Sequence, residues 1–288
     1  MLDFSQIKAI CFDVDSTVCL DEGLDMLATY CNKGDLVSQM YVKAVRHFAY
    51  TSSDLLQPKV ASRISSFAAY RCLLIYSREH TVHTIIHDEE YLLRYPFQTT
   101  QAMDGTMDVT AALEQRLKIL EPSKDLIRRF LDDTPLRLTP GVERLIASLR
   151  SSNVEVYLVS GGIFELVDRV AKKLCVPEDH VFSNRLIYND DGVAVDFDRR
   201  QPTSRSDGKK EVVAAIKSQL NGESKTGGVL VVGDGVTDAA ACPPADAFLG
   251  FGGVITRPSV QRTTPFFFHS FDEMHTFLQH CGLIAHSS

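Results

Sequence analysis

Short apolar segments alternate along this chain with segments of helical periodicity, and this alternation constrains the fold more than any other feature. Residues 8–14, 154–159 and 228–232 are apolar runs of the length expected for buried parallel strands, and each leads into an acidic or glycine-rich turn. Residues 181–182 and 247–251 are candidates for two further strands. The pattern predicts an α/β fold, a doubly wound parallel sheet covered by helices on both faces.

The segments between these strands have apolar residues at spacings of three and four. Residues 142–149, 164–174 and 212–220 each carry this pattern and are expected to form helices. Residues 186–197, with a polar Asn-Asp-Asp-Gly turn at their centre, predict an antiparallel hairpin appended to the sheet.

A long stretch after the first strand contains no strand-like run. Residues 21–135 are therefore expected to form a helical cap domain inserted after strand one, with Pro135 and Pro140 marking the return to the core. The predicted core comprises residues 1–20 and 136–288.

Two acids follow the first predicted strand directly. Asp13 and Asp15 lie in the string Asp-Val-Asp-Ser-Thr, and a chain that turns there can send their side chains in different directions. One carboxylate could then act as a nucleophile and the other as a proton donor. Taken alone, the string could also be a turn or a helix cap, although the chemical interpretation is favoured.

A second acidic cluster follows the strand at 228–232. Asp234 and Asp238 lie in Gly-Asp-Gly-Val-Thr-Asp, where glycines let the backbone approach an ion closely. Carboxylate oxygens are ligands that suit Mg²⁺, which also binds substrate phosphates. Taken alone, this string could be a surface turn.

Two further elements suit a phosphate group. Ser160 and Gly161 follow the second strand, where a hydroxyl and backbone N–H groups at a helix start favour an anion, although such a serine is often only an N-cap. Lys209 adds a positive charge near a predicted helix start, although an isolated lysine is usually solvated. Because parallel strands end at one sheet edge, Asp13, Ser160 and Asp234 are expected to lie together.

Charge and cysteine content bound the partners and the compartment. The net charge of −7 and the absence of basic patches argue against nucleic acid and against a membrane surface. Seven cysteines, with no CxxC pair, indicate reduced thiols in a cytoplasmic protein. The acidic start does not resemble a signal peptide, and no apolar run has the length of a membrane span.

Together and in this order, these elements resemble the haloacid dehalogenase (HAD) superfamily of aspartyl-phosphate phosphatases. The strings CFDVDSTV, LVSGG and GDGVTDAAACPPADAFLGFGG are most similar to the eukaryotic-type phosphoserine phosphatases, and the resemblance covers residues 1–40 and 99–288. It implies a HAD Rossmann-like core with a helical cap. It also implies Mg²⁺-dependent hydrolysis of O-phospho-L-serine to L-serine and phosphate through a phospho-aspartyl intermediate, a step of serine biosynthesis.

The resemblance implies a role for each acid. Asp13 would attack the phosphorus, and Asp15 would protonate the leaving serine oxygen and then activate the hydrolytic water. Mg²⁺ would be held by Asp13, the backbone carbonyl of Asp15 and Asp234, with Asp238 in support.

The resemblance also implies a set of substrate-binding residues. Glu22 would bind the substrate ammonium group and Arg116 its carboxylate, although both would otherwise be interpreted as solvated helical charges. The remaining members of the set are Met103 over the substrate and, around the phosphoryl group, Ser160, Gly161, Lys209 and Thr237, with Asn184 as a weaker candidate.

One segment departs from the family pattern. In the family, the first cap helix leads almost directly into a Met-Gly-Gly segment, whereas here residues 41–98, which contain no glycine, intervene. This segment is a genuine cap insertion, a segment retained by faulty splicing or gene modelling, or an interaction element, and the sequence leaves the three open. The corresponding tripeptide is Met103-Asp104-Gly105, so Asp104 would bring negative charge near an anionic substrate.

Three functions therefore stay open. The chain could be a phosphoserine phosphatase, a related phosphatase with altered specificity for small phospho-metabolites, or a catalytically impaired interaction protein. The complete set of core acids favours an enzyme with a small-molecule substrate, and a homodimer is compatible with the sequence.

Overall fold

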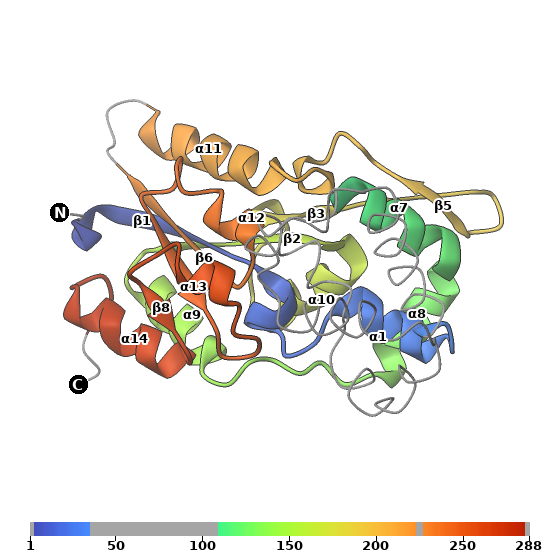
Figure 1. Ribbon diagram of the computed structural model, residues 1–288, viewed down its shortest axis with the longest axis horizontal. Helices are drawn as coiled ribbons and strands as arrows, with labels where there is room; N and C mark the ends of the chain where they lie inside the picture. Colours follow the sequence, from blue (N-terminus) through green and yellow to red (C-terminus); the bar gives the residue numbers. More distant parts are fainter. Residues whose placement is uncertain (1–2, 35–108, 223–226, 286–288) are drawn as a thin grey trace, which may run out of the picture.

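The computed structural model describes residues 3–34, 109–222 and 227–285. The sequence predictions for residues 41–98, Met103 and Asp104 lie outside the described residues. The described core is built on a six-stranded sheet in the order β3-β2-β1-β6-β7-β8, in which every neighbouring pair is parallel (Figure 1). The strands are β1 (Ile7–Phe12), β2 (Glu155–Ile163), β3 (Val181–Asn184), β6 (Gly228–Gly233), β7 (Ala247–Phe251) and β8 (Phe267–Phe268).

Helices cover both faces of this sheet, as expected for a doubly wound fold. In β1, Ile10 and Phe12 face one hydrophobic cluster, and Ala9 and Cys11 face the other, because successive strand residues point to opposite faces. The first cluster is formed with α9 (Val142–Ser151), α10 (Phe164–Lys173) and α14 (Phe271–His280). The second is formed with α11 (Gly208–Asn221), α12 (Val236–Ala239) and α13 (Pro258–Gln261).

The core strands and helices predicted from periodicity are confirmed, with two differences at the strands. The strand predicted at 154–159 continues to Ile163, so Ser160 and Gly161 belong to its last residues rather than to a turn, and α10 begins at Phe164. Strand β8 was not predicted, because two residues are too few to show a period. Short helical turns complete the core: η1 (Phe4–Gln6), η2 (Val14–Val18), η4 (Glu178–His180) and η5 (Pro202–Ser204).

The described cap residues form three helices and carry a third hydrophobic cluster. The helices are α1 (Gly23–Tyr30), α7 (Val109–Leu120) and α8 (Lys124–Asp133). The ammonium group of Lys33, just after α1, donates hydrogen bonds to the backbone oxygens of Ile119 (2.8 Å) and Leu120 (3.1 Å) at the end of α7. Helices α1 and α7 are thereby held together directly.

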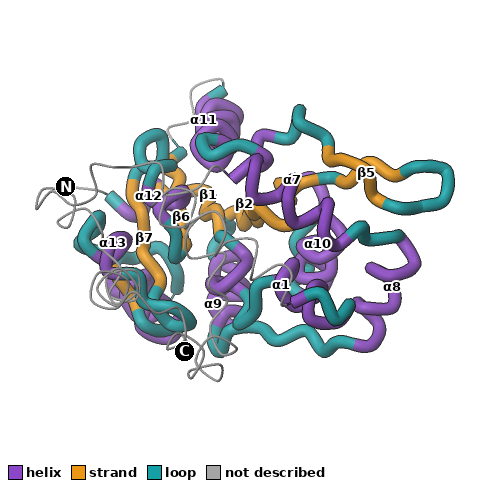
Figure 2. The backbone as a smooth tube through the Cα atoms, turned by 45° about the vertical axis from the view of Figure 1, so that its right-hand side comes forward, coloured by secondary structure: helices purple, strands orange, loops and turns teal. Residues whose placement is uncertain are grey.

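The predicted hairpin is present, as β4 (Leu186–Tyr188) and β5 (Ala194–Phe197), but its predicted attachment to the main sheet is wrong. It forms a two-stranded sheet of its own that lies beside α7 and α8, away from the core strands (Figure 2). Phe197 is buried in the cap cluster, and Ala194 N–H donates to the Pro122 carbonyl at 2.9 Å. The hairpin has an apolar inner face, and it packs against the apolar cluster of the cap helices because both surfaces are buried by this contact.

The carboxyl ends of the central strands form the edge that faces the cap. Strand β1 lies between β2 and β6, and Asp13 N–H donates to the Val232 carbonyl at 2.9 Å. Within the described residues, no helix has both the length and the apolar character needed to span a membrane.

Candidate active site

The turn that follows β1 separates the two acids of the first motif. Ser16 adopts a left-handed backbone conformation (φ 55°) within η2, which bends the chain out of the strand direction. Asp13 then contacts Lys209, whereas Asp15 accepts a hydrogen bond from Gly23 N–H at 2.7 Å. The two carboxylates therefore have different partners, as different chemical tasks require.

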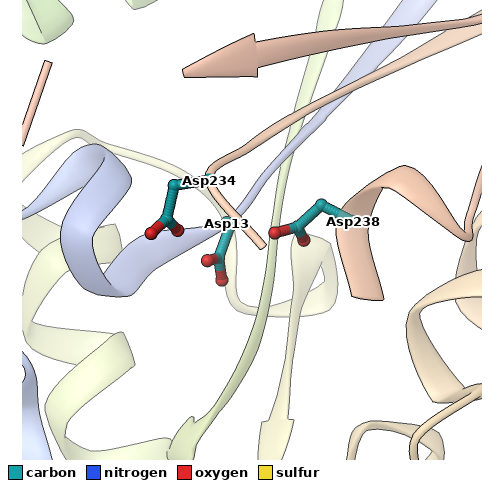
Figure 3. A group of neighbouring side chains, drawn as sticks. All are labelled: Asp13, Asp234 and Asp238. Carbon is teal, nitrogen blue, oxygen red and sulfur yellow. The ribbon is translucent and has the colours of Figure 1, made fainter. Parts of the chain in front are cut away.

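Three buried carboxylates meet at the end of the sheet. Ligand oxygens of Asp13, Asp234 and Asp238 all lie within 4.8 Å of one another, and their side chains turn toward a common space (Figure 3). The sequence-derived metal set was Asp13, Asp15 and Asp234. The carboxylate of Asp15 is not part of this group, and the predicted contribution of its backbone carbonyl stays a prediction.

Two buried cations balance these acids. Lys209 Nζ donates to Asp13 Oδ1 and to Asp238 Oδ1, both at 2.7 Å. Arg257 Nε donates to Asp234 Oδ2 at 3.1 Å, and Arg257 is only 3% exposed. Asp234 Oδ1 accepts a hydrogen bond of 3.2 Å from Thr17 Oγ1.

Burial dominates the protonation of the site. It raises the pKa of Asp15 to about 6, that of Asp234 to about 6 and that of Asp238 to about 7. For Lys209, burial alone would lower the pKa, but Asp13 and Asp238 outweigh it, so the pKa rises and the ammonium form is held. The site therefore keeps a permanent cation beside acids that titrate near neutral pH.

The donor set fits a divalent cation. Asp13 Oδ2 is buried and has no hydrogen-bond partner among the described residues. Among the described residues, two cations, Lys209 and Arg257, form ion pairs with these three carboxylates, so full ionisation of the group leaves one negative charge unmatched. Carboxylate oxygens around such a space are the ligands that Mg²⁺ prefers, and they leave room for water and phosphate oxygens.

The end of β2 forms the side of the site that suits a phosphate. Ser160 Oγ accepts a hydrogen bond from Gly162 N–H at 2.9 Å and lies 3.4 Å from Asp15 Oδ2. Asn184 Nδ2 donates to the Gly161 carbonyl at 2.8 Å and is itself held by Thr203. A Cβ placed on Gly161 would meet no atom within 4 Å, so the space beside this backbone is open.

The residues predicted to select the substrate are brought together only in part. Glu22 is buried, and Ser16 Oγ donates to Glu22 Oε1 at 2.6 Å. Burial raises the pKa of Glu22 well above its usual range, and the negative charge of Asp15 adds to the effect. Arg116 lies on α7, and its guanidinium is 3.6 Å from Asp25 on α1. Thr237 is half-buried in α12, between the two acids of its motif, and Met103 lies outside the described residues.

Sequence reasoning missed Arg257, Asp25 and Thr17. Thr17 is part of the first motif but was given no partner. Arg257 follows a glycine-rich segment without any recognisable spacing, and Asp25 has the appearance of an ordinary acid in the first turn of a helix. Only the three-dimensional contacts with Asp234 and Arg116 reveal them.

Comparison with known proteins agrees with this geometry. The family model for haloacid dehalogenase-like hydrolases matches residues 7–246. The phosphoserine phosphatase of Bos taurus is 34% identical over 271 residues, which cover 94% of this chain and 93% of that protein. The chain belongs to the phosphoserine phosphatases of the haloacid dehalogenase-like hydrolase family. The resemblance inferred from the motifs is thus confirmed.

Solved structures similar to this phosphatase share its fold over nearly the whole chain. DsGPDH of Dunaliella salina is 28% identical, with a TM-score of 0.63, and the match covers 96% of this chain and 36% of that one. A phosphoserine phosphohydrolase-like protein from Francisella tularensis is 22% identical, also with a TM-score of 0.63, and the match covers 94% of this chain and 99% of that one.

Proposed function

We propose that this phosphatase hydrolyses O-phospho-L-serine to L-serine and phosphate through a phospho-aspartyl intermediate on Asp13. The observation that carries the proposal is the state of that side chain. Lys209 holds Asp13 Oδ1, while Asp13 Oδ2 is buried without a hydrogen-bond partner among the described residues. In a chain related to phosphoserine phosphatases, Oδ2 is the natural nucleophile.

In the first half-reaction, Asp13 Oδ2 attacks the phosphorus as the bond from phosphorus to the serine oxygen breaks. Asp15 gives its proton to the departing serine oxygen. Its raised pKa of about 6 keeps part of the population protonated near neutral pH, as a general acid requires. Gly23 N–H holds the other end of this carboxyl group in place.

In the second half-reaction, the same carboxylate of Asp15 takes a proton from water, and the water oxygen attacks the phosphorus. Asp13 is released, and phosphate leaves. Lys209 and the backbone beside Gly161 bind phosphoryl oxygens in both halves, because phosphoryl transfer depends on positioning and on the neutralisation of charge.

We assign the Mg²⁺ site to Asp13, the backbone carbonyl of Asp15 and Asp234, with Asp238 in support. When bound, Mg²⁺ would withdraw charge from the transferring phosphoryl group and from Asp13. Arg257 and Thr17 fix the orientation of the Asp234 carboxylate, and Lys209 fixes that of Asp238.

Specificity for an amino acid comes from the cap side of the site. Glu22 binds the substrate ammonium group, Arg116 binds the carboxylate, and Met103 covers the substrate. The role of Glu22 is supported by its burial next to the turn that carries Asp15. We place the enzyme in the cytoplasm and leave its oligomeric state to measurement.

The test compares the full chain with Asp13→Asn, which keeps the shape of the side chain and removes the nucleophile. Phosphate release from L-phosphoserine and from p-nitrophenyl phosphate is measured with Mg²⁺ and with a chelator. We expect Mg²⁺-dependent release from phosphoserine by the full chain and none by the variant. After acid quenching, mass spectrometry should find phosphate on the peptide that contains Asp13.

Each other result would contradict a defined part of the proposal. Activity in Asp13→Asn would refute the nucleophile assignment. Release from the aryl ester alone would refute phosphoserine as the substrate and indicate altered specificity. No release from either ester would refute the enzymatic function.

A further inference from the structure

Arg116, the arginine to which we assign the substrate carboxylate, is close to a carboxylate of the protein itself. Asp25 lies in the first turn of α1, and its Oδ1 is 3.6 Å from Arg116 Nη2 on α7. Both side chains are largely buried, at 17% and 12% exposure respectively. The pair joins two helices of the cap whose positions in the sequence are far apart.

Helix α1 brings this pair to the reacting groups. Its first residue, Gly23, donates its N–H to Asp15, and Glu22 precedes it directly. Asp25 N–H donates to the Glu22 carbonyl at 3.1 Å, so Asp25 lies one helical turn from Glu22. The charge of Asp25 contributes to the raised pKa of both Asp15 and Glu22.

A buried acid near the binding site of an anionic substrate requires an explanation, because its negative charge repels the substrate. The carboxylate of Asp25 is within ion-pair distance of the Arg116 guanidinium, so it holds that cation beside the first turn of α1. Asp25 gives the guanidinium a partner on its own side of the site. At 3.6 Å the attraction is that of an ion pair at more than hydrogen-bond distance. A guanidinium has five N–H donors in a fixed plane, and this contact fixes the position of the cation without taking up one of those donors.

We propose that Asp25 is a positioning residue that holds the Arg116 guanidinium where it receives the substrate carboxylate, and so sets the preference for phosphoserine over phosphomonoesters that lack a carboxylate. The inference rests on the proposed function. It adds a specificity determinant that touches no substrate atom and acts on the substrate carboxylate through Arg116.

The test measures kcat and KM of the full chain and of Asp25→Asn for two substrates. O-phospho-L-serine carries the carboxylate, and O-phosphoethanolamine has the same phosphate and ammonium groups without it. In Asp25→Asn, we expect KM for phosphoserine to rise about tenfold, the size of one weakened charge-assisted hydrogen bond, with kcat within about twofold. Both constants for phosphoethanolamine should stay within about twofold.

The chain supplies a matched control. Asp125 on α8 also forms an ion pair with an arginine, Arg128, but both side chains are exposed, so Asp125→Asn should leave the constants for both substrates unchanged. In an Arg116→Met background, Asp25→Asn should add no further loss of selectivity. A full additional loss there would show that Asp25 acts on something other than Arg116 and would overturn the inference.

Two other results would also overturn it. An equal loss for both substrates in Asp25→Asn would assign Asp25 to the stability of the cap, and unchanged selectivity would leave it without a role in recognition. Failure of the proposed function looks different, because the unmodified chain would then show no preference for phosphoserine over phosphoethanolamine. In that case the assignment of Arg116 to the carboxylate fails first and that of Asp25 with it.

Discussion

The ammonium group of Lys209 donates a 2.7 Å hydrogen bond to Asp13, across 196 residues of sequence. Both side chains are almost completely buried, at 8% and 1% exposure. The pair ties the start of α11 to the end of β1, and it fixes one oxygen of the nucleophile while the other faces the site. Stability and catalysis thus depend on the same contact.

Removal of this cation should therefore cost stability as well as activity. In Lys209→Met, the buried charge of Asp13 loses its partner, and we expect the free energy of unfolding in Mg²⁺-free buffer to fall by about 3–5 kcal/mol. Urea denaturation measures the change. Lys210→Met removes the adjacent, exposed lysine and should change stability by less than about 0.5 kcal/mol. Equal values for the two variants would contradict a stabilising Lys209–Asp13 pair.

Asp15→Asn should affect substrates according to their leaving groups. A serine alkoxide needs a proton from Asp15, so kcat for phosphoserine should fall by about 10²–10⁴-fold. p-Nitrophenolate leaves without a proton, so the variant should still release one equivalent of it rapidly and then stall at the phospho-enzyme. Stopped-flow absorbance detects the burst. A single slow phase with no burst would show that Asp15 is needed for the attack itself.

The raised pKa of Glu22 predicts a pH dependence in substrate binding. Glu22 binds an ammonium group only as the carboxylate, and its upward-shifted pKa means that this form is lost at a higher pH than usual as the pH falls. KM for phosphoserine should therefore rise on acidification by up to about tenfold per pH unit. KM for O-phospho-L-lactate, which has no ammonium group, should rise less, and the ratio of the two KM values is the measurement. In Glu22→Gln this ratio should be independent of pH; a ratio that still changed would exclude Glu22 as the titrating group.

The ion pair between Arg257 and Asp234 predicts a link between metal binding and stability. Without a metal, Arg257 is the counter-charge of the buried Asp234, so Arg257→Met should destabilise the Mg²⁺-free protein. Bound Mg²⁺ would supply that charge instead. The rise in Tm on addition of Mg²⁺ should thus be larger in the variant than in the unmodified chain. The difference should be about 2–4 °C for each kcal/mol of additional stabilisation by Mg²⁺. Arg262→Met, at an exposed arginine just after α13, serves as the control. Equal Mg²⁺-induced shifts in the two variants would contradict the linkage.

The core of the fold could be predicted because its residues obey local rules. The continuous apolar run of β1 indicates a strand that is buried on both faces, and the periodicity of α9 indicates a helix that is buried on one face. Both patterns can be recognised without knowing which segments pack against them. The acids Asp13 and Asp234 were found for the same reason, since each follows its strand directly and parallel strands end at one edge.

What could not be predicted depends on contacts between distant segments. The hairpin of β4 and β5 has an ordinary hairpin sequence, and nothing in that sequence states that its inner face will cover cap helices. Arg257 and Asp25 have no motif, because each is defined by a partner on another element. Among the described strands, β8 pairs with β7 alone, at the edge of the sheet, and it is too short to be recognised from its sequence.

The hairpin and Lys33 have a consequence for how the cap tolerates change. Contacts among described residues hold α1 and α7 to each other and to the hairpin. A longer connection between the two helices then adds mainly loop-closure entropy, about 0.6 kcal/mol for each doubling of its length. Added chain length between α1 and α7 is thus thermodynamically cheap for this cap.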